Sequence, residues 1–124
     1  MNVQEIGQKL VELCRAGKNL DALSLYAPDA VSVEAMGSET MPAVMKGVDA
    51  IRGKGEWWFA NNEIHRSDAR GPYPNGERFA VVFDFEFTAK EGPTAGRRVK
   101  MEEVALYTVE NGKIVREEFF YSMG

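Results

Sequence analysis

The feature that most restricts how this chain can fold is a strict alternation of side chains over residues 79–88. Four phenylalanines and one valine occupy every second position there, and smaller or polar residues lie between them. Successive side chains of a β-strand point to opposite faces of a sheet, so this period predicts a long strand with one aromatic face. A second layer of structure has to cover such a face, which makes the strand part of a layered domain.

Further strands are predicted around this one, because the period of two continues from residue 63 to the end of the chain. It is interrupted at residues 71–76, 91–96 and 110–112, which are rich in the turn-forming residues Gly, Pro and Asn. Strands joined by short turns pair in an antiparallel manner, so we expect a four-stranded meander. Its strands are expected at residues 63–70, 79–88, 97–109 and 113–121.

The first half of the chain has the residue spacing of helices. Apolar residues recur every three or four positions over residues 2–16, which predicts an amphipathic helix that ends at Gly17. A short second helix is expected to begin with an N-cap at Asn19, to run through Tyr26 and to stop at Pro28.

A short strand is expected at residues 31–35, a loop at residues 36–47 and a third helix at residues 48–61. Gly53 and Gly55 lie inside this helix, where each costs about 1 kcal/mol relative to alanine. They indicate either a bend in the helix or the close approach of another segment.

These elements together predict an α+β fold in a single domain that covers residues 1–124. Three N-terminal helices are expected to pack on one face of a strongly curved, mainly antiparallel sheet, because helices that precede a continuous meander cover one of its faces. The result is a cone, and its open end is where a ligand pocket is expected.

The charge and the motif content exclude several classes of function. A net charge of −4 disfavours binding to nucleic acid and to anionic membranes. Neither a secretory leader nor an apolar run of about 18 residues is present, so a cytoplasmic protein is expected. The chain has one histidine, His65, and one cysteine, Cys14, which form no metal-ligand spacing. No phosphate-binding loop is found either, so neither a metal nor another cofactor is expected.

Three segments resemble sequences of the nuclear transport factor 2-like superfamily, which includes ketosteroid isomerases and SnoaL-like polyketide cyclases. Residues 22–38, ALSLYAPDAVSVEAMGS, resemble the second helix and first strand of these proteins. Residues 47–52, GVDAIR, resemble the start of their third helix, and residues 108–121, TVENGKIVREEFFY, resemble their final hairpin. The resemblance covers nearly the whole chain and implies the cone-shaped fold and a homodimer. It identifies the reaction poorly, because the superfamily contains isomerases, cyclases, hydrolases, dehydratases and non-enzymatic binders.

Only part of the catalytic set of ketosteroid isomerases is matched. The resemblance places Glu34 at the position of the general base. The position of the family's oxyanion tyrosine falls at about Leu10, and that of its protonated aspartate falls at Val104 or Ala105. None of these side chains donates a hydrogen bond, so steroid isomerisation by the familiar mechanism is not expected. SnoaL-like cyclases carry an acidic residue and a histidine in the pocket, which by resemblance implies His65.

The pairing of the last two strands decides which acids face inward. We interpret residues 110–112 as a three-residue loop, in which Val109 pairs with Lys113. Glu103 and Glu117 then project from neighbouring strands toward the same aromatic face, where poor solvation and mutual repulsion should raise the pKa of at least one carboxyl. Such a carboxyl suits general acid–base catalysis near neutral pH. A two-residue loop would turn one strand over and separate the two acids, which are alternatively structural acceptors for arginines or backbone groups.

Two sets of candidate site residues follow. The candidate catalytic residues are the polar side chains expected in the pocket: Glu34, His65, Glu103, Tyr107 and Glu117. The candidate ligand-binding residues are the aromatic and methionine side chains expected to line it: Tyr26, Trp58, Phe59, Phe83, Phe85, Met101, Phe119 and Tyr121.

Two functional hypotheses stay open from the sequence. The first is an enzyme without a cofactor, an isomerase, cyclase, hydratase or hydrolase, that uses the pocket carboxyls on a small apolar or cyclic compound. The second is a non-catalytic module that binds a hydrophobic ligand or serves in dimeric assembly. A homodimer is expected in both cases, because one face of the sheet mixes apolar and charged residues and has no helix to cover it.

Overall fold

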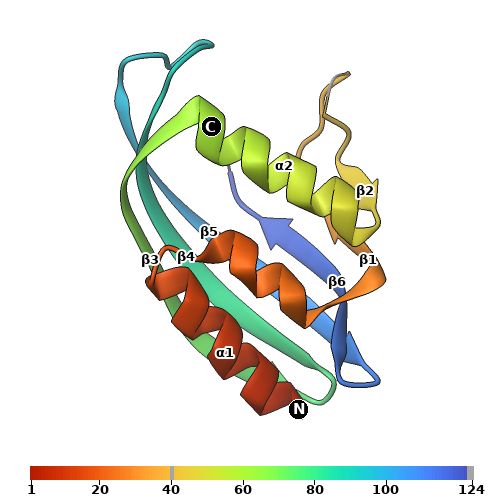
Figure 1. The fold of residues 1–124 in the computed structure, drawn as a ribbon. Coiled ribbons are helices and arrows are strands. Elements are labelled where there is room, and N and C mark those ends of the chain that lie inside the picture. The colour runs from red at the N-terminus through yellow and green to blue at the C-terminus, as the bar shows by residue number, and fades with distance from the viewer. Residues whose placement is uncertain (40, 123–124) are drawn as a thin grey trace.

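The computed structural model describes residues 1–39 and 41–122 and arranges them in two layers, a curved sheet and the helices on its concave side (Figure 1). The described strands form one six-stranded sheet in the order β2-β1-β6-β5-β4-β3. In chain order the elements are α1 (Val3–Arg15), the 3-10 helix η1 (Asn19–Leu25), β1 (Tyr26–Val33), β2 (Val44–Lys46), α2 (Val48–Asn61), β3 (Asn62–Asn75), β4 (Arg78–Ala89), β5 (Arg98–Glu110) and β6 (Lys113–Phe120). The α+β class and the curved sheet are therefore confirmed.

Helix α1 begins at a complete capping box. The side chain of Asn2 accepts a hydrogen bond from the backbone N–H of Glu5, and the Glu5 carboxylate accepts one from the backbone N–H of Asn2. Two of the free N–H groups at the helix start are thereby satisfied. Farther along, one face of α1 buries Ile6, Leu10 and Cys14. They are among the apolar residues whose three- and four-residue spacing predicted the helix.

The arrangement of three N-terminal helices is only partly correct. The second helix is a seven-residue 3-10 helix, and its first residue is Asn19, which was expected to be the cap. Tyr26 is already in strand β1, and Pro28 lies inside that strand. The third helix, α2, follows β1 and β2, so only α1 and η1 precede the sheet. The second helix, η1, is only seven residues long, so it would make few i→i+4 hydrogen bonds as an α-helix. This favours the tighter 3-10 form.

Two features of the sheet were not predicted. Strand β2 lies within the expected loop at residues 36–47 and pairs with β1 in an antiparallel manner. Three residues are too few to show a period of two, so the sequence carries no signal for it. Strand β1 also pairs with β6, in a parallel manner, with Ser32 opposite Glu117. This long-range pairing joins the first strand of the chain to the last one in a single sheet.

Strand β3 continues through the turn that was expected at residues 71–76. A register shift between Arg70 and Tyr73 accommodates the Gly-Pro pair, and the turn lies at residues 76–77 instead. Bulges of this kind let a strand contain a proline, which cannot donate to the ladder.

The hairpin between β5 and β6 has a two-residue turn, so the expected three-residue loop is wrong. Glu110 pairs with Lys113, and Asn111 and Gly112 have φ values of 51° and 75°, as a type I′ turn requires. A bulge then shifts the register, so that Tyr107 lies opposite Glu117. The two-residue turn alone would have turned the side chains of β6 to the other face of the sheet. The extra residue of the bulge turns them back. Glu103 and Glu117 therefore still share one face, although their partners differ from those expected.

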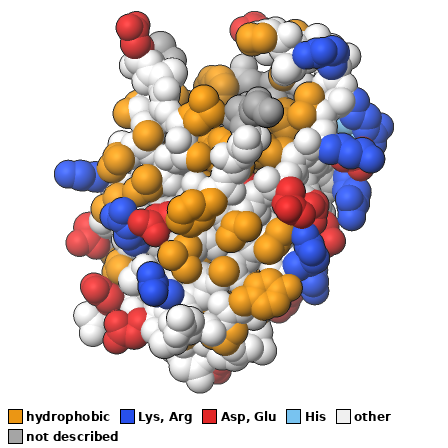
Figure 2. Space-filling model, turned by 180° about the vertical axis from the view of Figure 1, so that it is seen from behind, with side chains coloured by type: hydrophobic (Ala, Val, Ile, Leu, Met, Phe, Trp, Pro, Cys, Tyr) orange, Lys and Arg blue, Asp and Glu red, His pale blue; other side chains and the backbone are white. Residues whose placement is uncertain are grey.

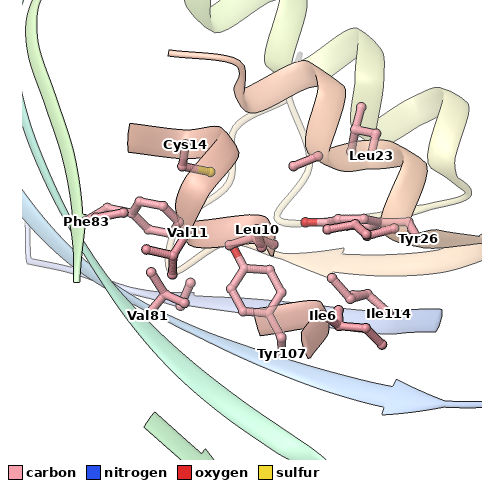
Figure 3. Packing of buried hydrophobic residues seen from close by; sticks show 14 of the residues in the cluster. Ile6, Leu10, Val11, Cys14, Leu23, Tyr26, Val81, Phe83, Tyr107 and Ile114 are labelled. Carbon is pink, nitrogen blue, oxygen red and sulfur yellow. The ribbon is translucent and has the colours of Figure 1, made fainter. Parts of the chain in front are cut away.

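The core lies between α1, η1 and the concave side of the sheet, as Figure 3 shows. The ring of Tyr107 stacks on that of Phe79, with centroids 4.9 Å apart and an interplanar angle of 17°. The side chains of the core thus fill the space between the helices and the sheet.

The convex side of the sheet carries an apolar patch (Figure 2). Val82, Val104 and Phe120 lie side by side on β4, β5 and β6, and Val104 and Phe120 are 37% and 54% exposed. No helix in the described part of the chain is both long and apolar enough to cross a membrane.

Candidate functional site

Glu117 is the most deeply buried acid among the described residues and is held by two hydroxyl groups. Its side chain points from β6 into the concave side, and the residue is only 3% exposed. The hydroxyl of Tyr26 donates to Oε1, and that of Ser32 donates to Oε2 over 2.5 Å. Burial raises the pKa of Glu117, while Lys54 and the two hydroxyls act in the opposite direction. Both oxygens are occupied, so Glu117 has the surroundings of a structural acceptor.

Lys54 lies beside these groups and was not among the predicted site residues. Its Nζ is 2.8 Å from Oε1 of Glu34, 2.5 Å from Oγ of Ser32 and 3.8 Å from Oε2 of Glu117. The ammonium also lies 5.2 Å from the centre of the Phe119 ring. A single cation thus joins Glu34, just after β1, to Glu117 of β6.

Glu34 follows the last residue of β1 and is held from both sides. Lys54 donates to its Oε1, and the hydroxyl of Tyr121 donates to its Oε2 over 3.0 Å. Its side chain is 21% exposed, so solvent or a ligand can reach it. Each carboxylate oxygen retains a lone pair, which leaves Glu34 able to accept a proton.

Glu103 differs from the other two acids because no hydrogen bond or ion pair to it is found among the described residues. It lies on β5, half-buried, opposite the buried ring of Phe83. Burial is the main cause that raises the pKa of Glu103 to about 8, and the charges of Glu34 and Glu117 raise it further. At neutral pH this side chain is therefore mostly a neutral carboxylic acid, which can donate a hydrogen bond or a proton.

An aromatic wall stands next to Glu103. Phe83 and Phe85 of β4 stack with centroids 6.0 Å apart, and the edge of Trp58 packs against Phe85 and Phe87. Met101 lies opposite Phe85 and is partly buried. Most of the predicted ligand-binding residues, including Phe119 and Tyr121, thus lie around the acids.

Two predicted residues lie elsewhere, and a third is buried in the core behind the site. His65 is on the exposed side of β3, where its Nε2 lies 2.7 Å from Oγ1 of Thr88. Phe59 borders a separate hollow beside residues 17–21. Tyr107 is 3% exposed within the core, and burial raises its pKa well above the usual value. Of the predicted catalytic set, the structure brings together Glu34, Glu103 and Glu117, with Tyr107 behind Glu117.

Two residues of the site, Lys54 and Ser32, were missed, although the sequence carries a signal for each. Lys54 comes three residues after Ile51 and four before Trp58, which places all three on the face of α2 that is turned to the sheet. Ser32 comes two residues before Glu34 along the first strand. Lys54 was missed because a lysine between two glycines is typical of an exposed surface position.

Two hollows on the surface are bordered by residues other than these acids. One has a volume of about 250 Å³ and is bordered by residues 17–21 and Phe59; another, on the convex side, is bordered by Asp84, Lys100 and their neighbours. No group of three or more His, Cys, Asp or Glu side chains in residues 1–39 and 41–122 is placed to hold a metal ion. The site itself is a half-exposed rim of Glu34, Lys54, Glu103, Phe119 and Tyr121 above the buried Glu117.

The arrangement contains the parts of an acid–base pair. Glu103 is a neutral acid in an apolar setting, and Glu34 is a carboxylate paired with a cation. Environments that separate the protonation states of two nearby carboxyls are typical of general acid–base sites.

Comparison with known proteins identifies close relatives in structure. The SnoaL-like domain family matches residues 1–121. A protein from Mesorhizobium loti, provisionally named a SnoaL-like polyketide cyclase with carbohydrate phosphatase as a second description, is 44% identical. The alignment covers 98% of this chain and 100% of that one, with a TM-score of 0.89. Among proteins with curated descriptions, none matches the chain.

More distant structures share the fold. A protein of Catenulispora acidiphila with a ketosteroid isomerase-like fold, solved in complex with trimethylamine, is 18% identical over 98% of this chain and 88% of its own, with a TM-score of 0.70. A provisionally named polyketide cyclase of Pseudomonas putida is 18% identical over 99% and 93%, with a TM-score of 0.73. At this identity they are evidence for the fold alone.

Proposed function

Because the chain belongs to the SnoaL-like domain family, we propose that it binds a small apolar carbonyl compound and transfers a proton on it without a cofactor. Glu103 is the acid that donates to the ligand oxygen, and Glu34 is the base that accepts a proton from an adjacent carbon. The observation that carries this proposal is the state of Glu103, a half-buried carboxyl without a hydrogen-bond partner among the described residues and with a pKa raised to about 8.

The setting of Glu103 supports an acid role. A buried carboxyl without a partner is costly as an anion, so the neutral form is favoured and its O–H is free for a ligand. The flanking Phe83, Phe85 and Trp58 would cover the flat apolar body of a cyclic compound. Glu103 is also the acid nearest in sequence to Val104 and Ala105, the positions to which the resemblance assigns the family's protonated aspartate.

A phosphate-transferring activity has less support. Lys54 is the cation of the site, and it is already engaged by Glu34 and Ser32. A phosphate dianion placed here would meet the carboxylates of Glu34 and Glu117, which repel it.

The experiment that tests the proposal measures both charge and turnover. Carbon-13 NMR titration of the wild type and of E103Q assigns the Glu103 carboxyl, which should titrate near pH 8. A library of small cyclic enones, lactones and epoxides is then screened, and E103Q should lose at least about 100-fold in turnover, the contribution typical of general acid catalysis. A midpoint near 4.5 for Glu103 would remove the basis of the proposal. H65Q is the matched control, because His65 lies on the exposed side of β3, and it should retain activity.

A second candidate is a non-catalytic module that binds a hydrophobic ligand. It is favoured by the two hydroxyls that occupy Glu117 and by the apolar Leu10 at the position where the family carries an oxyanion donor. In this case apolar cyclic compounds would quench Trp58 fluorescence on binding, W57F would keep that response, and no member of the library would be converted.

In both cases we propose a homodimer that forms through the convex side of the sheet. The row of Val82, Val104 and Phe120 is apolar; Val104 and Phe120 are exposed, and Val82 is partly buried. It is flanked by charges of both signs, such as Arg70 with Glu102 and Arg116 with Glu118. Two copies related by a two-fold axis would bury the apolar row and pair these charges.

A further inference from the structure

The acid–base pair of Glu34 and Glu103 does not explain why Lys54 lies between Glu34 and Glu117. We infer that Lys54 is the positioning residue that fixes the side chain of Glu34 in place and holds Glu117 in its carboxylate form, so that Glu103 carries the proton of the site. This inference rests on the proposed function, since it explains why one of three neighbouring acids is the proton donor.

The hydrogen bonds of the Lys54 ammonium are directed at one side of the site. It donates to Glu34 over 2.8 Å and to the Ser32 hydroxyl over 2.5 Å. Because Ser32 accepts from Lys54, its own hydrogen is directed to Oε2 of Glu117, also over 2.5 Å. Lys54 thus supports Glu34 directly and Glu117 through a hydroxyl, and Phe119 covers the ammonium from another side.

The protonation of Glu117 follows from these contacts. Its Oε1 accepts from Tyr26 and its Oε2 accepts from Ser32, an arrangement that fits a carboxylate. Glu103 receives no such donor among the described side chains. An acid with donors on both oxygens loses its proton more readily than a neighbour with none.

Helix α2 is built to hold the ammonium at this place. Ile51, one turn before Lys54, is buried, and Trp58, one turn after it, packs on Phe85 and Phe87. A Cβ at Gly55 would lie 2.8 Å from Cδ2 of Leu20, so the glycine lets the helix approach η1 closely. The side chain of Lys54 is 14% exposed, so little solvent competes for its charge.

Other titratable groups also face the site. They come from every element that packs around it: Glu34 and Tyr26 from β1 and its end, Glu103 and Tyr107 from β5, Glu117 and Tyr121 from β6 and its end, and Cys14 from α1. Burial raises the pKa of Cys14 to about 12 and raises those of the tyrosines, so they stay neutral in the neutral range. Lys54 is the largest cause that lowers the pKa of Glu117, whereas it is the last and smallest cause for Glu103.

The test is a carbon-13 NMR titration of the Glu117 carboxyl in the wild type, K54M and K54R. Methionine keeps the length of the side chain and removes the charge, whereas arginine keeps the charge. K54M should raise the titration midpoint of Glu117 by about one pH unit or more, the effect of removing a cation within 4–6 Å. K54R should restore the midpoint most of the way to that of the wild type.

The matched control is K9M, which removes the same charge from an exposed ion pair with Glu12 on α1. It should leave the Glu117 midpoint unchanged. If K54M does not fold, E34Q/K54M removes the ion pair as a unit, which is far less destabilising than leaving one partner unpaired. The double variant should then show a higher Glu117 midpoint than E34Q alone.

Several outcomes would overturn the inference. They are a Glu117 midpoint that does not respond to K54M, one that K54R fails to restore, or a wild-type Glu117 that is already protonated at pH 7. These differ from failure of the proposed function, in which Glu103 itself would titrate near 4.5. A Glu103 midpoint near 8 with a Glu117 that is insensitive to Lys54 would remove only the role of Lys54.

Discussion

Glu103 and Glu117 project from neighbouring strands into the same side of the sheet, yet only Glu117 is bound by other described side chains. The hydroxyls of Tyr26 and Ser32 occupy both oxygens of Glu117, and Glu103 faces the rim with a raised pKa of about 8. The same residue type at two adjacent inward positions thus has two roles, one structural and one available to a ligand.

The first prediction concerns stability and pH. The folded pKa of Glu103, about 8, lies above the value of 4.5 that is usual for a free glutamate side chain, so the unfolded chain loses this proton first as the pH rises. The Glu103 proton therefore stabilises the fold below about pH 4.5, and this contribution is lost progressively up to about pH 8, by at most about 1.4 kcal/mol per pH unit. E103Q removes the titration, so its free energy of unfolding relative to the wild type should increase between pH 5 and pH 8.

Urea unfolding at several pH values measures this difference, with E102Q as the control on the exposed face of the same strand. A stability difference between E103Q and the wild type that does not change with pH would contradict the raised pKa.

The second prediction concerns the hydroxyl of Tyr26. Y26F removes one of the two side-chain donors to the buried Glu117, which should cost about 1–3 kcal/mol in the free energy of unfolding. S32A should cost more, because it also removes the acceptor of Lys54. Chemical denaturation of the three proteins checks the order, and an unchanged stability of Y26F would show that the hydrogen bond to Glu117 contributes nothing.

The third prediction compares the two glycines of α2. A Cβ at Gly53 meets no atom within 4 Å, so G53A should stabilise the protein by up to about 1 kcal/mol. A Cβ at Gly55 would lie 2.8 Å from Leu20, so G55A should gain less or be destabilising. Thermal unfolding of the pair decides it, and an equal gain in both variants would be inconsistent with the close approach to η1.

The fourth prediction concerns assembly. V104D places a carboxylate at the centre of the apolar patch on the convex side, so it should convert a dimer into a monomer while the far-UV circular dichroism stays that of the folded protein. Multi-angle light scattering measures the mass, and V44D is the control, at an exposed valine on the short edge strand β2. A wild type that is monomeric at tens of micromolar would refute the proposed dimer.

Much of the site could be predicted from the sequence, because the face to which a strand residue points depends only on whether its position in the alternation is odd or even. The period of two places Glu103 among inward-facing residues, and the Phe83–Phe87 alternation identifies the wall beside it. The hairpin length was misjudged, but the bulge after the turn compensated for it, so the shared face of Glu103 and Glu117 survived. His65 could not be placed in the same way, because a register shift between Ile64 and Arg66 interrupts the period at that residue.

The sequence by itself determined helices α1 and α2, the strands of the meander and the faces of those strands, because each follows from the repeat of a local backbone geometry. Only the tertiary structure decided that β1 pairs in parallel with β6, which places Ser32 opposite Glu117, and that α2 lies close enough to bring Lys54 to Glu34. These contacts join residues far apart in the chain, and they depend on which surfaces pack together. No local periodicity encodes that choice.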